Sequence, residues 1–559
     1  MQSILAEMQS SGVLDASGVE RVRPLLSAGK PLDEALVACG AVAEDQALKF
    51  LAAKFGVQFL DLSTVQFDKA FLQKFPVRIL LKHRLLPIRL DDDVLLVASS
   101  RIFDTSGLDE LRVATGLECR LTLAPASEID RCTRTYLGVG ADTIESMANE
   151  ADVHRIAVVS EEADDVDLSG AAGEASIIRF VNQVLTEAIQ LRATDVHFEP
   201  FERELRLRYR IDGVLQEVNV PPQLKQFQAA IISRLKILAH LNIAEKRLPQ
   251  DGRIKLKIGD NELDVRASVI PMLHGEGVVL RLLHRSSALL GLEQLGMSPG
   301  DVKSIERILD LPHGIFLVTG PTGSGKTTTL YAALSRINDA ERKIITIEDP
   351  VEYYLRGINQ IQVNTKAGLT FGLGLRSILR HDPDVVLIGE IRDVETAEIA
   401  VQASLTGHLV FSTLHTNDAP GALARLVDMG VEPYLVASSL EGVLAQRLVR
   451  LICTSCREEV HTPPEILPRD CAPEIPKVTW RGKGCRACQG TGFRGRNCIC
   501  ELMDVTEEIR ACILSSTSAG EIRKIAVRQG MRSLRSDGWR LVEAGLTTVE
   551  EVVRATKDQ

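Results

Sequence analysis

The chain has 559 residues, of which 45% are apolar and 25% are charged, a composition typical of globular proteins with several cores. Its 65 basic and 75 acidic residues give a net charge of −10, which argues against a broad nucleic-acid-binding surface. No apolar run reaches the roughly 18 residues of a membrane span, and the first residues lack the pattern of a secretory signal. We therefore expect a protein that is cytoplasmic or peripheral to a membrane.

The first 138 residues are predicted to form an N-terminal region of two parts. Residues 1–62 contain a helical repeat, in which Ile4, Met8, Gly12 and Leu14 correspond to Leu32, Leu36, Gly40 and Val42. Each copy is an amphipathic helix stopped by glycine, so the two copies can pack face to face. Residues 63–138 are expected to form a small α+β unit, with a strand at 94–98 and a helix at 126–136.

The clearest domain boundary is a predicted linker at 139–172. Its central part, residues 141–168, holds nine acidic residues, one arginine and few large apolar groups. Such a segment buries too little apolar surface to offset the entropy lost on ordering, so it should be flexible. An α+β domain is expected at 173–290, where Leu205–Ile211 alternates arginine with apolar residues like a half-exposed strand.

A phosphate-binding loop dominates the remaining domain, 291–559. The apolar run 315–319 has the composition of a buried strand, and residues 320–327 then fit G-x-x-x-x-G-K-[ST] at every fixed position. Lys326 is expected to reach the β- and γ-phosphates of ATP, and Thr327 to hold Mg²⁺. The predicted nucleotide-binding residues are Gly320, Pro321, Thr322, Gly323, Ser324, Gly325, Lys326, Thr327 and Thr328.

Three further apolar strands are predicted after the loop, which indicates an α/β domain with a largely parallel sheet. The first, 344–347, is followed by the acidic stretch 348–352, and the second, 384–388, by Gly389 and Glu390. Acidic side chains at the carboxyl ends of such strands face the ligand crevice. One such acid alone could be a helix cap or a solvated carboxylate. The third strand, 409–413, is bracketed by His408 and His415.

Two cysteine pairs, Cys453-x-x-Cys456 and Cys485-x-x-Cys488, delimit an expected insertion at 453–488. Four thiolates in two such pairs suit tetrahedral zinc, and a site with four protein ligands is structural. One alternative is four reduced core thiols. Another is that Cys498 and Cys500 supply a ligand pair, since C-x-C is also a possible spacing.

The order of these motifs resembles the secretion ATPase superfamily, whose members drive type II secretion and type IV pilus assembly. The resemblance covers roughly 174–559 and rests on EDPVE at 348–352, LIGEIRD at 387–393 and GHLVFSTLHTND at 407–418. It implies a multidomain α/β protein with a P-loop (RecA-like) ATPase core, a preceding α+β domain and a zinc-binding insertion. QDGRI, GLRSILR and LEGVLAQRLVRLIC look most like the type II secretion ATPase, with the pilus-assembly ATPase as the alternative.

The same resemblance implies roles for particular residues. Glu352 would orient or activate the attacking water, and Glu390 would act through the metal or the water. His408 and His415 would lie near the nucleotide. Arg266 and Arg281 of the preceding domain match the family's arginines that reach the γ-phosphate. GCRACQGTGFRGR matches the family's zinc insertion and favours Cys485 and Cys488 over the C-x-C pair.

The resemblance also implies a homo-oligomer, in particular a hexamer, whose N-terminal region docks on platform proteins at the inner membrane. In some relatives the helical repeat binds cyclic di-GMP through an R-L-G start in each copy. This chain has Ser3-Ile4-Leu5 and Pro31-Leu32-Asp33 instead, which argues against that ligand. Two rival hypotheses are a scaffold that binds ATP but barely hydrolyses it, and a motor that translocates nucleic acid.

Overall fold

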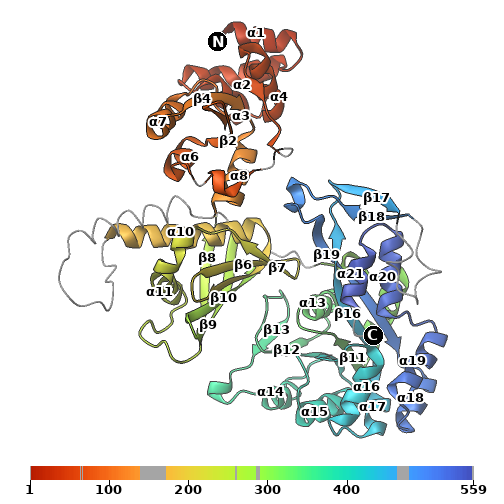
Figure 1. Ribbon diagram of the computed structural model, residues 1–559. Coiled ribbons are helices and arrows are strands. Elements are labelled where there is room, and N and C mark those ends of the chain that lie inside the picture. Colours follow the sequence, from red (N-terminus) through yellow and green to blue (C-terminus); the bar gives the residue numbers. More distant parts are fainter. Residues whose placement is uncertain are drawn as a thin grey trace. The chain divides into compact units, whose positions relative to one another are not determined.

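The computed structural model describes the chain except residues 1, 63, 64, 66, 73, 139–170, 259, 260, 285–289, 462–477 and 557–559. The chain divides into two compact units, residues 1–282 and 283–559 (Figure 1). The expected acidic linker at 139–172 lies almost wholly outside the described residues. In the described ranges, no helix combines the length and the apolar character that crossing a membrane requires.

The N-terminal range in which the sequence predicts a helical repeat is helical. Its four helices are α1 (Gln2–Ser10), α2 (Ala16–Ser27), α3 (Leu32–Ala38) and α4 (Glu44–Phe55). Gly12 and Gly40 follow α1 and α3 with φ of 71° and 61°, the left-handed conformation that ends helices and favours glycine. The equivalent residues Met8 and Leu36 are both buried in one core, so the two copies pack against each other.

A four-stranded sheet follows the repeat, in the order β1-β4-β3-β2. Its elements are β1 (Gln58–Phe59), α5 (Lys69–Leu72), α6 (Val77–His83), β2 (Leu86–Asp91), β3 (Val94–Ser99), α7 (Ser106–Thr115), β4 (Glu118–Leu123) and α8 (Ala126–Leu137). The strand and the helix expected in this unit are β3 and α8. Because β1 pairs with β4, this sheet begins within the range assigned to the repeat.

The second domain of this unit is built on a six-stranded sheet in the order β7-β6-β5-β10-β9-β8. Its elements are α10 (Ala171–Gln190), β5 (Ala193–Pro200), β6 (Leu205–Ile211), β7 (Val214–Val218), α11 (Gln228–Leu238), β8 (Gln250–Ile258), β9 (Asn261–Met272) and β10 (Gly275–His284). Strand β6 coincides with the predicted alternating strand. Its residues Leu205, Leu207 and Tyr209 are buried, and its arginines face the other side.

The second unit contains a seven-stranded sheet in the order β13-β12-β14-β15-β11-β16-β19. Its strands are β11 (Gly314–Thr319), β12 (Ile344–Glu348), β13 (Asn359–Gln362), β14 (Val385–Ile388), β15 (Leu409–Leu414), β16 (Leu440–Ile452) and β19 (Phe493–Asp504). All neighbouring pairs are parallel except β16 and β19. The predicted, largely parallel sheet is therefore confirmed.

Helices cover both faces of this sheet, as a buried parallel sheet requires. They are α12 (Pro299–Leu309), α13 (Lys326–Ile337), α14 (Phe371–Ile378), α15 (Val394–Leu405), α16 (Ala419–Asp428), α17 (Pro433–Ser439), α18 (Glu507–Leu514), α19 (Ala519–Arg528), α20 (Leu534–Glu543) and α21 (Val549–Ala555). Ile315 and Leu317 of β11 pack into the core under α14–α19, whereas Phe316 and Val318 pack into the core under α12 and α13.

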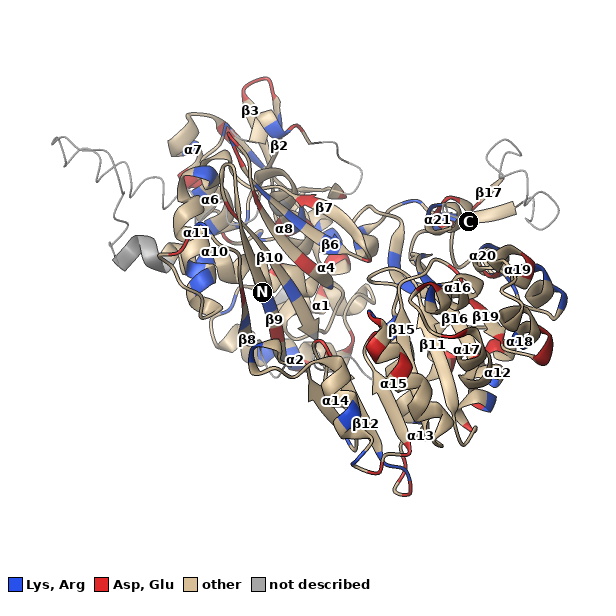
Figure 2. Ribbon diagram, turned by 90° about the horizontal axis from the view of Figure 1, so that it is seen from below, with Lys and Arg blue, Asp and Glu red and all other residues tan. Residues whose placement is uncertain are grey.

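The last four helices of the chain, α18–α21, follow β19. On α18 and α19, acidic and basic residues occur together (Figure 2) and form the ion pairs Arg528–Glu508 and Lys524–Glu521. A two-stranded hairpin, β17 (Arg457–His461) and β18 (Val478–Gly482), lies in the chain between β16 and β19. The ends of these elements carry the four cysteines described below.

Candidate active site

The phosphate loop connects the buried strand β11 with α13. A Cβ atom at Gly320 would lie 2.5 Å from the backbone oxygen of Gln446, so only glycine fits at this first position. The nine predicted nucleotide-binding residues form one continuous turn that ends in the first turn of α13. The N–H groups and the positive end of that helix are therefore available to an anion at the loop.

Lys326 turns back onto its own loop. Its Nζ donates to the carbonyl oxygens of Gly320 at 2.8 Å and Pro321 at 3.1 Å. Burial lowers the pKa of Lys326, and the nearby carboxylate of Glu390 acts in the opposite direction. The loop thus holds its one lysine at the place where polyphosphate charge would be bound.

Glu390 follows β14 and contacts the side chains of an arginine and a histidine. One carboxylate oxygen accepts from Arg392, and the other lies 3.0 Å from Nε2 of His415, which follows β15. Burial raises the pKa of Glu390, but the hydrogen bonds from Arg392 and His415 outweigh it and lower the pKa below its usual value. The carboxylate is therefore ionised at neutral pH and oriented by two partners.

The segment that carries His415 is fastened to the start of the phosphate loop. Thr319, the last residue of β11, lies with its Oγ1 2.8 Å from Oγ1 of Thr416. The backbone N–H of Thr416 donates to the same Thr319 oxygen at 2.8 Å. The ends of β11 and β15 are thereby held together, and the structure brings Lys326, Glu390 and His415 to one edge of the sheet.

The acidic stretch that begins at the last residue of β12 contains a buried carboxylate that the sequence analysis did not single out. Glu348 is 4% exposed and accepts hydrogen bonds from Tyr331, Thr346 and Gln360. Burial raises the pKa of Glu348 in spite of these donors. The sequence did contain a signal for this burial, because Glu348 is the last residue of a strand whose other residues are mostly apolar. Glu352 follows this strand and is half-buried, with its backbone N–H beside the Tyr331 hydroxyl.

His408 does not lie near the phosphate loop of its own chain, so that expectation is wrong. It precedes β15, and its backbone oxygen accepts from the N–H of Gly314 at the start of β11. The loop begins at the other end of β11, about 17 Å away for strands of this length. The His408 Nδ1 instead lies 2.8 Å from the oxygen of Ala403 at the end of α15.

Arg266 and Arg281 lie in the first unit, on β9 and β10. The Arg281 side chain is 53% exposed, and its Nε lies 3.0 Å from Oδ1 of Asp195. Arg266 is half-buried opposite Arg253 of β8. Their expected contact with the γ-phosphate stays a prediction.

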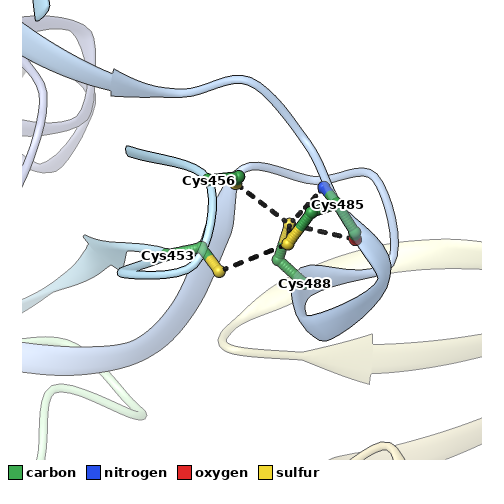
Figure 3. Close-up of side chains that lie close together, drawn as sticks. All are labelled: Cys453, Cys456, Cys485 and Cys488. Atoms are coloured by element: carbon green, nitrogen blue, oxygen red, sulfur yellow. Dashed lines mark hydrogen bonds between the residues drawn. The ribbon is translucent and has the colours of Figure 1, made fainter. Parts of the chain in front are cut away.

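Cys453, Cys456, Cys485 and Cys488 form a compact cluster (Figure 3). All four sulfur atoms lie within 4.8 Å of one another, with 3.7 Å between Cys453 and Cys485 and between Cys456 and Cys488. A tetrahedral zinc with Zn–S bonds of about 2.3 Å separates its sulfur ligands by about 3.8 Å, so the group fits this ion.

The surroundings of Cys488 suit a metal-bound thiolate. Its sulfur accepts from the backbone N–H groups of Cys485 at 3.1 Å and Gly492 at 3.2 Å. Although burial raises the pKa of the Cys488 thiol, these donors lower it to about 7. Cys498 and Cys500 are buried within β19 and, in the part of the chain that the structure describes, do not join the cluster.

Comparison with known proteins agrees with this geometry. The family model "Type II/IV secretion system protein" matches residues 170–554, and the MshEN domain model matches residues 55–142. The Legionella pneumophila ATPase DotB shares the fold, with a TM-score of 0.50 at 20% identity over 68% of this chain and 96% of that chain.

Several curated relatives match over much longer stretches than a single motif. The type II secretion system protein E of Xanthomonas campestris is 45% identical over 87% of this chain and 85% of its own length. The type II secretion system ATPase E of Vibrio cholerae is 50% identical over 70% and 78%. The type IV pilus assembly ATPase PilB of Myxococcus xanthus is 42% identical over 94% of both chains. The chain therefore belongs to the Type II/IV secretion system protein family.

Proposed function

We propose that this chain is the ATPase motor of a type II secretion system, which works in the cytoplasm at the inner membrane. It hydrolyses ATP with Mg²⁺ and so drives pseudopilus assembly and protein export. The observation that carries the proposal is the ionised Glu390, held by His415 and Arg392 beside the phosphate loop. The identities to type II secretion proteins support the choice of pathway.

Hydrolysis needs a phosphate cradle, a positioned water and positive charge at the γ-phosphate. The loop is the cradle, and Lys326 exchanges its contacts with loop carbonyls for contacts with the β- and γ-phosphates. Thr327 would hold Mg²⁺, which neutralises phosphate charge when it is bound. Glu352 orients the attacking water. Glu390, in its ionised form, acts through the metal or the water.

Phosphate release from ATP by the purified full chain tests this activity. Lys326→Ala should abolish turnover, since it removes the charge that binds the phosphates. Lys343→Ala is the matched control, because Lys343 lies before β12 and bonds to the backbone at His381. A wild-type chain that binds ATP without turnover would indicate the scaffold hypothesis, and strong stimulation by single-stranded DNA would indicate nucleic-acid translocation.

The proposal includes a ring of this chain, in particular a hexamer, in which the first unit supplies Arg266 and Arg281 to the γ-phosphate. Arginine at that place can raise turnover by orders of magnitude. The Asp195 partner of Arg281 holds its guanidinium at the sheet surface, from which it can be exchanged for phosphate. Arg266→Ala should reduce kcat far more than nucleotide affinity. Full activity in a demonstrably monomeric sample would contradict the ring.

We also assign structural zinc to the four-cysteine cluster. Metal analysis should find about one zinc per chain, and Cys453→Ser with Cys485→Ser should lose it, because four thiolates define this site. Ligand binding and local folding are coupled, so the double variant should be cleaved faster by protease around 453–488. Cys498→Ser with Cys500→Ser is the control and should keep its metal.

Pilus assembly is the second candidate function, because the pilus ATPase of Myxococcus xanthus matches this chain over nearly its whole length. Deleting the gene in its own bacterium separates the two. The proposal predicts that secreted enzymes are retained in the cells while surface pili remain. Loss of pili with normal enzyme secretion would indicate the pilus-assembly function instead. The N-terminal region is proposed to dock on inner-membrane platform proteins and not to bind cyclic di-GMP.

A further inference from the structure

A buried glutamine on β16 forms a hydrogen bond with the backbone of the phosphate loop. Gln446 is 2% exposed, and its neighbour Ala445 pairs with Thr319, the residue that precedes the loop. Its Nε2 donates to the backbone oxygen of Ser324 at 2.7 Å, and its Oε1 accepts from the hydroxyl of Thr329 at 2.8 Å. One side chain therefore joins the loop, the first turns of α13 and the neighbouring strand.

The contact with Ser324 fixes the orientation of one peptide group. In a planar trans peptide the carbonyl oxygen and the following N–H point in opposite directions. Because the oxygen of Ser324 is bonded to Gln446, the N–H of Gly325 points away from the Gln446 side chain. Backbone N–H groups directed inward are what binds phosphate oxygens in such a loop.

The orientation of this peptide has to be fixed by a contact from outside the loop, because glycine does not restrict the backbone there. Gly325 has a φ of 90°, and glycine adopts positive and negative φ with similar ease, so the peptide before it can rotate. A Cβ atom at Gly325 would lie 2.7 Å from the Gln446 Nε2. Gln446 therefore excludes from this position a larger residue, whose side chain would restrict φ.

We propose that Gln446 is a positioning residue for ATP hydrolysis, which holds the Ser324–Gly325 peptide with its N–H toward the bound phosphates. The inference rests on the proposed function, since it presupposes a nucleotide in the loop. Gln446 itself does not touch the reacting atoms. It acts through the loop backbone, so its loss should weaken nucleotide binding and slow turnover while the fold is retained.

The test compares Gln446→Met with Leu444→Ala in the full chain. Methionine has a similar length but neither the donor nor the acceptor. Leu444 is fully buried on the same face of β16. It lies opposite Val318 of β11, two residues before the loop, and its side chain has no hydrogen-bonding group. The readouts are the Kd for a fluorescent ADP, kcat for phosphate release and the melting temperature.

Gln446→Met removes both hydrogen bonds and should raise the Kd about ten-fold, because the Ser324–Gly325 peptide loses the bond that orients it. Leu444→Ala should lower the melting temperature more and leave the Kd within about two-fold. Thr329→Val, which keeps the bond to Ser324, should raise the Kd by less than Gln446→Met. If Gln446→Met does not fold, Gln446→Asn replaces it, because the shorter amide cannot span both contacts.

Two results would overturn the inference: an unchanged Kd and kcat in the glutamine variant, or an equal rise of the Kd in Leu444→Ala, which would reveal general loosening of the core. Failure of the proposed function looks different. In that case the wild-type chain itself would bind no ADP, and Lys326→Ala would behave like the wild type.

Discussion

The carboxyl ends and the amino ends of the parallel strands lie at opposite edges of the seven-stranded sheet. The two edges hold different side chains, although β15 runs from one to the other. At the carboxyl edge, the end of β15 places His415 against Glu390 and fastens Thr416 to Thr319. At the amino edge, the start of the same strand places His408 against α15 and the first residue of β11. Two histidines only seven positions apart in the sequence therefore have different neighbours, because a strand separates its ends by its whole length.

Among the side chains that follow β14 and β15, the largest expected effect comes from Glu390. Glu390→Gln should lower kcat by about 100-fold, the lower end of what a positioned acid or base contributes. Nucleotide affinity should stay within a few-fold, since the loop and Lys326 are unchanged. Glu341→Gln is the matched control, because this exposed acid precedes β12 at the amino edge. Equal turnover in the two variants would remove the functional difference between the edges.

A smaller effect is expected from the two histidines. His415→Ala should lower kcat about ten-fold, because Glu390 loses one of the two hydrogen bonds that orient it. His408→Ala should leave kcat within about two-fold and lower the free energy of unfolding by about 1 kcal/mol, because the Ala403 oxygen near the end of α15 loses one of its hydrogen bonds. Steady-state kinetics and urea unfolding measure the two quantities. A His408→Ala variant with the larger loss of kcat would contradict this assignment, or would show that His408 acts on a neighbouring subunit.

The smallest effect concerns Glu348, whose pKa burial raises above the ordinary 4.5. Above that pH the unfolded chain releases this proton while the folded chain still retains it, so stability falls as pH rises through the folded pKa. Glu348→Gln should remove this part of the pH dependence. The change should amount to a few degrees in the melting temperature, since about 1 kcal/mol shifts a domain of this size by about 2–4 °C.

Thermal unfolding at pH 5 and pH 8 measures this difference, in the transition that an ATP analogue shifts upward. Glu390→Gln should instead lower stability to the same extent at pH 5 and at pH 8, so it should leave the pH dependence in this range unchanged. The folded-state pKa of Glu390 is lowered, so its contribution to stability is present above pH 4.5 and lost only as pH falls further. Identical pH profiles for the two variants would contradict the contrast between these carboxylates.

Local patterns explain which parts could be predicted from the sequence. Short stretches of neighbouring residues are enough to predict the phosphate loop, the strands before and after it, and the CxxC pairs. Glu390 was found because it follows an apolar strand, and parallel strands collect their carboxyl ends at one edge. The choice of Cys485 and Cys488 as the second ligand pair came from the resemblance, since the spacing alone also allowed Cys498 and Cys500.

Non-local contacts explain what the sequence did not reveal. His408 was grouped with His415 because both flank one strand, yet only the register of β11 against β15 decides which end meets the loop. Strand β19 was missed because its glycine, arginine and cysteine residues form a strand only when they pair with β16. Gln446 lies in an apolar run, and its two partners are more than 100 positions away in the sequence.

Hydrogen–deuterium exchange of the full chain, with and without a non-hydrolysable ATP analogue and Mg²⁺, tests the placement of the nucleotide most directly. We expect slower exchange in peptides that cover 320–328, 389–392 and 415–416, all at the carboxyl edge. Peptides that cover 312–314 and 406–408 at the amino edge should exchange as before. Protection at the amino edge, with none in the phosphate loop, would rule out nucleotide binding at the carboxyl edge.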